Sequence, residues 1–253
     1  KCYVYVYSAT ESERYFRPNS LTGNRQCTGS GEWSGNYLNW ATTQTIDPFR
    51  KILTGGLRVK DTETETWLEK ARHPGQGGGF PTRDLTDDDE IEGATPFSSD
   101  RIRVRISGLG TEMRFSLNNN NFNNNPTNYR PGVDDPYDDR GFEMSVRVSV
   151  CDDSVGVEEN CRQYGDNWKP EGLIQQNAES IRFSVFGYLN DSDVERDGGV
   201  LRARQKYVGP RKLEAGQGYV DNEATEWDPD TGIFVQNPDS DDAADTSATI
   251  VNS

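Results

Sequence analysis

The stretch WSGNYLNWATTQTIDPFRKILTGG, residues 33–56, places aromatic and aliphatic side chains inside an otherwise very polar chain. Its apolar residues fall near helical spacing, which predicts helix up to the natural stop at Gly55-Gly56. Pro48 interrupts a single helix because it lacks an amide donor, whereas Asp47 before it suits an N-cap. We therefore expect either a kink near residue 46 or two short helices, the second starting at Pro48. The spaced residues are Leu38, Ala41, Ile46, Phe49, Ile52 and Leu53.

The composition of the whole chain limits its partners. The 253 residues carry a formal net charge of −15, and phosphate groups would repel such a surface. This argues against nucleic acid and against anionic membranes. No run approaches the ~20 apolar residues of a membrane helix, so no membrane insertion is expected. The sequence opens on Lys1-Cys2 without an initiator methionine, which is typical of a processed or trimmed piece.

Four cysteines, an even number, favour disulfides in an oxidising compartment, the cell exterior or the periplasm. Three pairings are possible, and the local choice joins Cys2 with Cys27 and Cys151 with Cys161. Zinc is the alternative, but the spacing is wrong and His73 is the one histidine.

Alternating apolar residues predict strands at 2–9, 101–108, 113–117 and 142–150, with a further strand or strand-loop at 198–210. The more fully apolar segment 181–189 suits the middle of a sheet covered on both faces. Thr62 with Glu65 forms a capping box, which predicts a helix over 61–75 with Trp67, Leu68 and Ala71 on its buried side. A short helix is expected to begin at Pro170, and residues 75–100 are expected to be a loop.

One acidic turn is a candidate calcium site. Carboxylates recur at alternate positions before two glycines, and calcium prefers several oxygens gathered on a sharp turn. The spacing fails the EF-hand pattern, and a solvated acidic turn is the competing interpretation. The acidic turns at 134–139 and 228–230 are weaker candidates. The carboxylates are Asp191, Asp193, Glu195 and Asp197.

Enzymatic chemistry has little support in the sequence. There is no Gly-x-Ser-x-Gly elbow, no phosphate-binding loop and no Cys/His pair. His73 stands beside Pro74, where we expect it to cap a helix. The sequence therefore predicts a protein that is not an enzyme, with an extracellular hydrolase as a remote alternative.

The opening stretch resembles a signature of the PilC/PilY-type type IV pilus tip adhesins. That family carries W-S-G-N-F-L-N-W-A-T, then a helix ending in L-x-G-G, then R-x-x-D-T. The last of these is matched by Arg58, Asp61 and Thr62. Further similar segments are KCYVY at 1–5, the cysteine loop from 150 with its KPEGL turn, RDGGVLRARQKYVGP at 196–210 and EWDPDTGIFVQNPD at 226–239. The signature residues are Trp33, Gly35, Asn36, Leu38, Asn39, Trp40, Gly55 and Gly56.

This resemblance implies an α/β fold, a partial von Willebrand A-like domain in which helices pack on a mainly parallel sheet. It implies that Trp40, Phe49, Ile52 and Leu53 are buried against that sheet, with Trp33 and Tyr37 closing the approach. The Asp-x-Ser-x-Ser metal motif of A-type domains is absent, and the family's calcium loop would lie beyond Ser253. We expect one domain over 1–236 and a polar tail over 237–253, together forming the middle of a larger polypeptide.

The function implied by the resemblance is cell-surface adhesion and type IV pilus biogenesis, with mechanical load carried by the sheet and no catalysis. Its partners would be minor pilins of the pilus tip or a host or abiotic surface, after export through the periplasm. The alternative is a self-assembling extracellular structural protein whose polar loops bind calcium between subunits.

Overall fold

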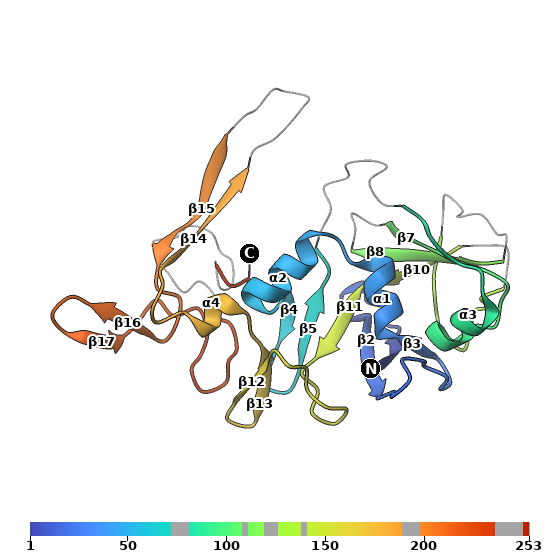
Figure 1. Cartoon of the computed structure of the whole chain (residues 1–253), viewed down its shortest axis with the longest axis horizontal. Coiled ribbons are helices and arrows are strands. Elements are labelled where there is room, and N and C mark those ends of the chain that lie inside the picture. Colours follow the sequence, from blue (N-terminus) through green and yellow to red (C-terminus); the bar gives the residue numbers. More distant parts are fainter. Residues whose placement is uncertain are drawn as a thin grey trace. The chain divides into compact units, whose positions relative to one another are not determined.

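The computed structural model of the chain (Figure 1) describes residues 1–71, 81–107, 111–118, 126–137, 141–188, 198–235 and 250–252. The helices are η1 (Glu11–Glu13), α1 (Gly35–Thr42), α2 (Ile46–Thr54), α3 (Asp88–Ala94) and α4 (Leu173–Gln176). The strands up to residue 128 are β1 (Cys2–Val6), β2 (Tyr15–Ser20), β3 (Glu32–Ser34), β4 (Arg58–Asp61), β5 (Thr66–Glu69), β6 (Arg83–Leu85), β7 (Ile102–Ser107), β8 (Glu112–Leu117) and β9 (Thr127–Asn128). The later strands are β10 (Phe142–Ser145), β11 (Arg147–Val150), β12 (Cys161–Tyr164), β13 (Asn167–Pro170), β14 (Phe183–Tyr188), β15 (Gly199–Lys206), β16 (Arg211–Glu214) and β17 (Gly218–Asp221).

The chain divides into two compact units. Unit 1 comprises Lys1–Pro48 and Trp67–Gly156, and unit 2 comprises Phe49–Thr66 and Val157–Ser253. Each unit has its own hydrophobic core. The expected boundary between residues 236 and 237 falls outside the described residues and stays a prediction.

Unit 1 contains two sheets. One has the strand order β3-β1-β2-β11-β5 and the other β6-β7-β8-β10-β9. Pairing is antiparallel in β1–β2, β1–β3, β6–β7, β7–β8 and β8–β10, and parallel in β2–β11 and β9–β10. The α/β class is confirmed, but the mainly parallel sheet expected of a von Willebrand A-like domain is wrong for the described strands. Short strands joined by tight turns need no helical crossover, and this permits antiparallel neighbours.

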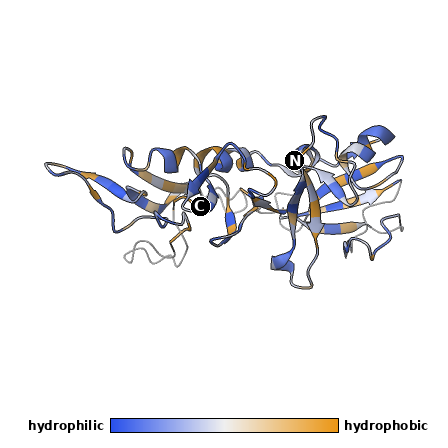
Figure 2. Ribbon diagram, turned by 90° about the horizontal axis from the view of Figure 1, so that it is seen from below, coloured by the Kyte–Doolittle hydropathy of each residue, from blue (hydrophilic) through white to orange (hydrophobic). Residues whose placement is uncertain are grey.

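Trp33 lies at the centre of the core of unit 1, where it is 1% exposed. Its ring packs edge-on against Phe97 and Phe115, with centroids 5.3 and 5.7 Å away, and stacks near Tyr37 at 6.3 Å. The alternating residues of β7 bury one face of that strand against the same core, and Figure 2 shows hydrophilic and hydrophobic residues alternating along the strands. Trp33 and Tyr37 are therefore core residues.

The opening stretch forms two short helices, as one of the two alternatives predicted. The second helix begins at Ile46, two residues before Pro48, and Gly55 follows its end with φ +83°. Asp47 does not cap the helix as expected. Its carboxylate instead accepts hydrogen bonds from the backbone N–H groups of Gln44 (2.8 Å) and Ala71 (2.6 Å).

The burial expected for this stretch is wrong. Trp40 is 45% exposed and Phe49 58% exposed, and Ile52 and Leu53 are exposed as well. Thr54 is the buried residue of α2. Asp47 accepts a hydrogen bond near the start of the helix, and the backbone of Gly55 lies close to that of Pro170 just after its end.

The helix expected over 61–75 is also wrong. The chain is extended in β4 and β5, and Thr62 and Glu65 close the turn between them. The Thr62 N–H donates to the Glu65 carbonyl (2.9 Å), and the Glu65 N–H donates to Thr62 Oγ1 (3.1 Å). The spacing of three residues is common to a capping box and to this turn. The β-branched threonines at alternate positions favour strand.

Other expectations need correction in unit 1. The single strand predicted over 142–150 is two strands, β10 and β11, which belong to different sheets. The region expected to be a loop contains β6 and α3, whose N-cap Asp87 accepts a hydrogen bond from the Glu90 N–H (3.0 Å). The acidic run that resembled a turn instead stabilises the positive end of a helix. His73 lies outside the described residues.

In its described residues, unit 2 contains three two-stranded antiparallel sheets, β12–β13, β14–β15 and β16–β17. β14 is therefore not the covered central strand that its apolar sequence predicted. The expected helix after Pro170 is α4, but it begins at Leu173 because Pro170 ends β13. No helix in the described part of the chain is long and apolar enough to cross a membrane.

A buried charged cluster as the candidate functional site

Arg58 of β4 lies at the centre of unit 2 with its side chain almost completely buried. Its Nη1 donates to Asp61 Oδ2 (2.9 Å) and to the carbonyl of Gly232 (2.8 Å), and its Nη2 donates to the carbonyl of Pro170 (2.7 Å). The Phe234 ring lies against the guanidinium at 3.7 Å from carbon to centroid. One planar cation thus binds segments that are far apart in the sequence.

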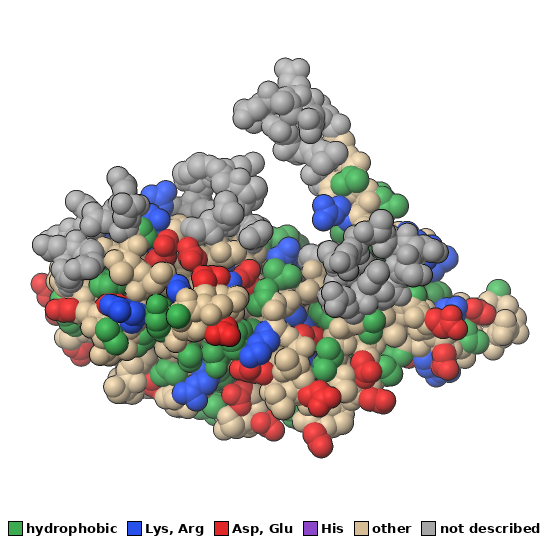
Figure 3. All heavy atoms as spheres, turned by 180° about the vertical axis from the view of Figure 1, so that it is seen from behind, with side chains coloured by type: hydrophobic (Ala, Val, Ile, Leu, Met, Phe, Trp, Pro, Cys, Tyr) green, Lys and Arg blue, Asp and Glu red, His purple; other side chains and the backbone are tan. Residues whose placement is uncertain are grey.

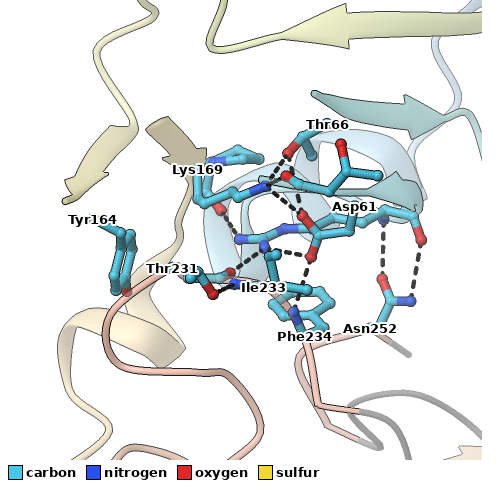
Figure 4. Close-up of polar contacts among 12 residues, drawn as sticks. Asp61, Thr66, Tyr164, Lys169, Thr231, Ile233, Phe234 and Asn252 are labelled. Carbon is cyan, nitrogen blue, oxygen red and sulfur yellow. Dashed lines mark hydrogen bonds and ion pairs between the residues drawn. The ribbon is translucent and has the colours of Figure 1, made fainter. Parts of the chain in front are cut away.

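Asp61, at the end of the same strand, uses both carboxylate oxygens (Figure 4). Oδ2 also accepts the backbone N–H of Phe234 (2.9 Å), while Oδ1 accepts from Lys169 Nζ (2.8 Å) and Thr66 Oγ1 (3.2 Å). A carboxylate so fully engaged is held in one position.

Lys169 of β13 is the second buried cation, and its side chain is 1% exposed. Besides the bond to Asp61, Nζ donates to Thr66 Oγ1 (3.0 Å) and to the carbonyl of Thr62. All three hydrogens of the ammonium group therefore have an acceptor within the cluster.

The electrostatics follow from this geometry. Burial by itself would raise the pKa of Asp61, but the charge of Arg58 and the hydrogen bond from Lys169 hold this pKa below its ordinary value of 3.8. Burial lowers the pKa of Lys169 and the pKa of Arg58, and Asp61 opposes both shifts. Asp61 therefore compensates two cations.

Glu171 supplies further negative charge beside the cluster. It is buried, accepts a hydrogen bond from the Tyr164 hydroxyl and lies 3.7 Å from Arg162. Burial and the hydrogen bond to Glu171 together raise the pKa of Tyr164, so the phenol stays protonated. Glu171 is thus a second carboxylate beside the two buried cations.

The last described residues of the chain are bound to the same unit. The Asn252 side chain pairs with the backbone of Arg58: its Oδ1 accepts the Arg58 N–H (2.9 Å) and its Nδ2 donates to the Arg58 carbonyl (3.2 Å). The backbone N–H groups of Ile250 and Val251 donate to Glu226 Oε2 at 2.9 and 2.8 Å. Glu226 is completely buried and forms an ion pair with Lys206 at 3.0 Å.

Near the cluster, two glycines allow two segments of the backbone to approach each other closely. A Cβ on Gly55 would stand 2.5 Å from the carbonyl oxygen of Pro170, and a Cβ on Gly172 would stand 2.3 Å from the backbone of Leu53. The Gln175 side chain accepts from the Gly172 N–H (3.1 Å) and donates to the Thr54 carbonyl (2.7 Å). The end of α2 and the start of α4 therefore fit together only with glycine at both positions.

Several segments quoted for the family resemblance meet in this cluster. The R-x-x-D-T segment supplies Arg58 and Asp61, the KPEGL turn supplies Lys169 and Pro170, and the EWDPDTGIF segment supplies Gly232 and Phe234. The role of Lys169 was missed, because a lysine in a polar segment gives no sequence signal of burial. The Asn252 contacts were also missed, because the segment 237–253 was interpreted as a polar tail.

The other predicted site residues lie elsewhere. Cys2 and Cys27 form a buried disulfide in unit 1, with Cα atoms 5.6 Å apart, and Cys151 and Cys161 are also disulfide-bonded. Both predicted disulfides are confirmed, so none of the thiols can ligate zinc. In α1, Leu38 is buried, whereas Asn36 and Asn39 are exposed beside Trp40. Asp191, Asp193, Glu195 and Asp197 lie outside the described residues.

The cluster is suited to holding segments together. Its charged groups are turned toward one another and toward backbone carbonyls. Buried ion pairs with good hydrogen bonding impose a unique arrangement, and breaking one partner is costly.

Comparison with known proteins places this architecture in a family. The model of the family described as PilY1 homolog, small alpha/beta domain, matches residues 1–129. A type IV pilus biogenesis factor PilY1 homolog of Xylella fastidiosa is 47% identical over 264 residues, which cover 98% of this chain and 21% of that protein. A second protein of that description from the same organism is 26% identical over 85% of this chain and 16% of its own length.

The chain belongs to the PilY1 homolog family. It spans about a fifth of the length of the first of these relatives. No solved structure matches it.

Replacing Asp61 by Asn should lower the free energy of unfolding by about 3–5 kcal/mol at neutral pH, because Arg58 and Lys169 lose the shared carboxylate. The matched control is Glu65→Gln, which removes the same charge from the more exposed pair with Lys60 (2.6 Å) and should cost less than about 1 kcal/mol. Denaturant unfolding followed by circular dichroism measures both.

The loss of stability in Asp61→Asn should depend on pH. The folded pKa of Asp61 is lowered, so its contribution is present above the unfolded value of 3.8 and is lost as the pH falls through the folded value. The difference between wild type and Asp61→Asn should therefore shrink on acidification below pH 3.8. A difference that stays constant down to pH 2 would contradict the assigned charge state.

Gly55→Ala should destabilise unit 2 more than Gly216→Ala. Both glycines have nearly the same backbone angle, φ +83° and +84°, so the strain of placing alanine there is shared. A Cβ at Gly216 meets nothing within 4 Å, whereas at Gly55 it meets the backbone of Pro170. We expect about 1–2 kcal/mol for Gly216→Ala and several kcal/mol for Gly55→Ala. Equal losses in thermal or denaturant unfolding would show that the close approach is not required.

Proposed function

We propose that this chain is a non-catalytic, load-bearing part of a type IV pilus biogenesis factor, displayed at the cell surface or pilus tip, where it takes part in adhesion. The names of the two relatives support the connection with the pilus. Minor pilins of the tip and a host or abiotic surface are the proposed partners.

The observation that carries the proposal is the range of the cross-links in unit 2. Arg58 binds groups that are 112, 174 and 194 residues away in the sequence, on Pro170, Gly232 and Asn252. Separating these segments under tension requires several buried hydrogen bonds to break together, with charges left unpaired. The disulfides add covalent limits to extension in a protein exposed to an oxidising exterior.

A non-catalytic role is supported by the use of the buried charges. Asp61 and Lys169, the groups that would be candidates for acid–base chemistry, hydrogen-bond to each other and to neighbours in a completely engaged arrangement. A general base needs a free position facing a substrate.

Calcium binding at Asp191, Asp193, Glu195 and Asp197 is a second part of the proposal, and it rests on the sequence alone. Calorimetric titration with calcium chloride should give a dissociation constant of about 10⁻⁴–10⁻³ M, as in extracellular modules. Asp191→Asn with Asp193→Asn should abolish this heat, whereas Asp228→Asn with Asp230→Asn should leave it unchanged. An unaltered titration in the first variant would refute the site.

The load-bearing role can be tested in the native cell by exchanging the gene that encodes this chain. Cells with Asp61→Asn should show fewer surface pili and less attachment to glass per surface pilus than wild type, whereas Glu65→Gln cells should match wild type. Sheared surface pilin and attached cells are counted, and an immunoblot reports the amount of exported protein. Wild-type piliation and attachment in Asp61→Asn cells, together with a confirmed loss of stability, would overturn the proposal.

A further inference from the structure

The β14–β15 hairpin is a two-stranded sheet with a large exposed apolar surface. Phe186 is 67% exposed and Leu201, directly opposite it in the register, is 51% exposed, with Val200 also exposed. At the other end of the hairpin, Ala203 is buried in the core of unit 2 and Val185 packs against it. The end of the hairpin near Val185 and Ala203 is therefore packed against the core, while Phe186 and Leu201 are exposed at the surface.

A two-stranded sheet of this kind is incomplete by the usual rules. Isolated hairpins are marginally stable in water, and a third strand or a covering element is needed for independent stability. Within the described residues β14 pairs with β15 on one side and with no strand on the other.

The two edges of the hairpin differ in how well they are protected against pairing with a further strand. β15 carries basic residues at alternate positions, Arg202, Arg204 and Lys206, and charges of this kind block pairing with a further strand. β14 has the sequence FSVFGY, with neither charge nor proline. The strands of the other two-stranded sheets all contain a charged residue: Arg162 in β12, Lys169 in β13, three charges in β16 and Asp221 in β17. β14 is thus the unprotected edge among the described strands of these sheets.

The charge of the two strands favours one kind of partner. Every charged residue of β14 and β15 is basic, and exposed Arg182 precedes β14, whereas the carboxylates of the hairpin belong to the segment that joins the strands. Figure 3 shows hydrophobic and basic side chains on this hairpin. Lys206 is already paired with Glu226, whereas Arg182, Arg202 and Arg204 are exposed. A second copy of the hairpin would bring like charges together, whereas an acidic strand would complement them.

We propose that β14 is a docking edge for an extended segment of a partner protein with alternating apolar and acidic side chains. The segment adds to β14 as a third strand by main-chain hydrogen bonding, which is a general mode of peptide recognition. Its apolar side chains cover Phe186 and Leu201, and its carboxylates interact with the arginines of the hairpin. The inference rests on the hairpin and does not depend on the load-bearing role.

The test uses the whole chain and a fluorescent, end-blocked seven-residue peptide of alternating valine and glutamate. Fluorescence anisotropy should show binding, and hydrogen exchange should show added protection of the amides of residues 183–188. A peptide with N-methyl groups at alternate residues, which cannot pair by its backbone, should bind at least ten-fold more weakly. A peptide with lysine in place of glutamate should also bind at least ten-fold more weakly.

Matched variants distinguish binding at the hairpin from non-specific hydrophobic binding. Phe186→Ser and Arg202→Gln should each weaken binding several-fold, whereas Leu213→Ser should not, because Leu213 is a comparably exposed apolar residue on the β16–β17 hairpin. All of these side chains are exposed, so folding should be preserved, and circular dichroism checks this.

Three outcomes would overturn the proposal. The first is equal binding of the N-methylated peptide, or no added protection at residues 183–188. The second is protection of these amides on concentrating the chain alone, with a dimer mass in analytical ultracentrifugation, which would mean self-pairing. The third is burial of the hairpin against vesicles of anionic phosphatidylserine when the chain binds none of the peptides. This would mean that the hairpin binds a membrane surface.

Discussion

Unit 2 depends on one carboxylate placed between two buried cations. Burying Arg58 and Lys169 is costly, and Asp61 compensates both through hydrogen bonds at 2.9 and 2.8 Å. The geometry that makes this compensation possible also fixes the carbonyls of Pro170 and Gly232 and the N–H of Phe234. The positions of β13 and of the chain around residue 234 therefore follow from this group of charges as much as from the small apolar core.

The sequence predicted well those features that depend on local pattern. Alternation identified β7 and β8, and the even number of cysteines led to both disulfides. The helix break near Pro48 was also predicted, because proline acts through its own backbone. Local rules of this kind need no knowledge of the rest of the fold.

The failures arose where a pattern had two physical meanings. Thr62 and Glu65 are three residues apart in a capping box and equally in the turn that closes β4 and β5. The apolar spacing of Phe49 and Ile52 predicted a buried face, but both side chains are exposed, because helical periodicity shows which residues share a face and not what covers that face. Burial of Lys169 could not be foreseen, because its acceptors come from Asp61 and Thr66, about a hundred residues earlier in the chain.

Glu226 has a consequence for the chain between residues 235 and 250. Its backbone carbonyl accepts the Val235 N–H at 3.0 Å, and its side chain binds the N–H groups of Ile250 and Val251. A single buried residue thus holds the chain on both sides of the segment 236–249. The two ends of that segment are therefore fixed close together by one residue, which closes it into a loop.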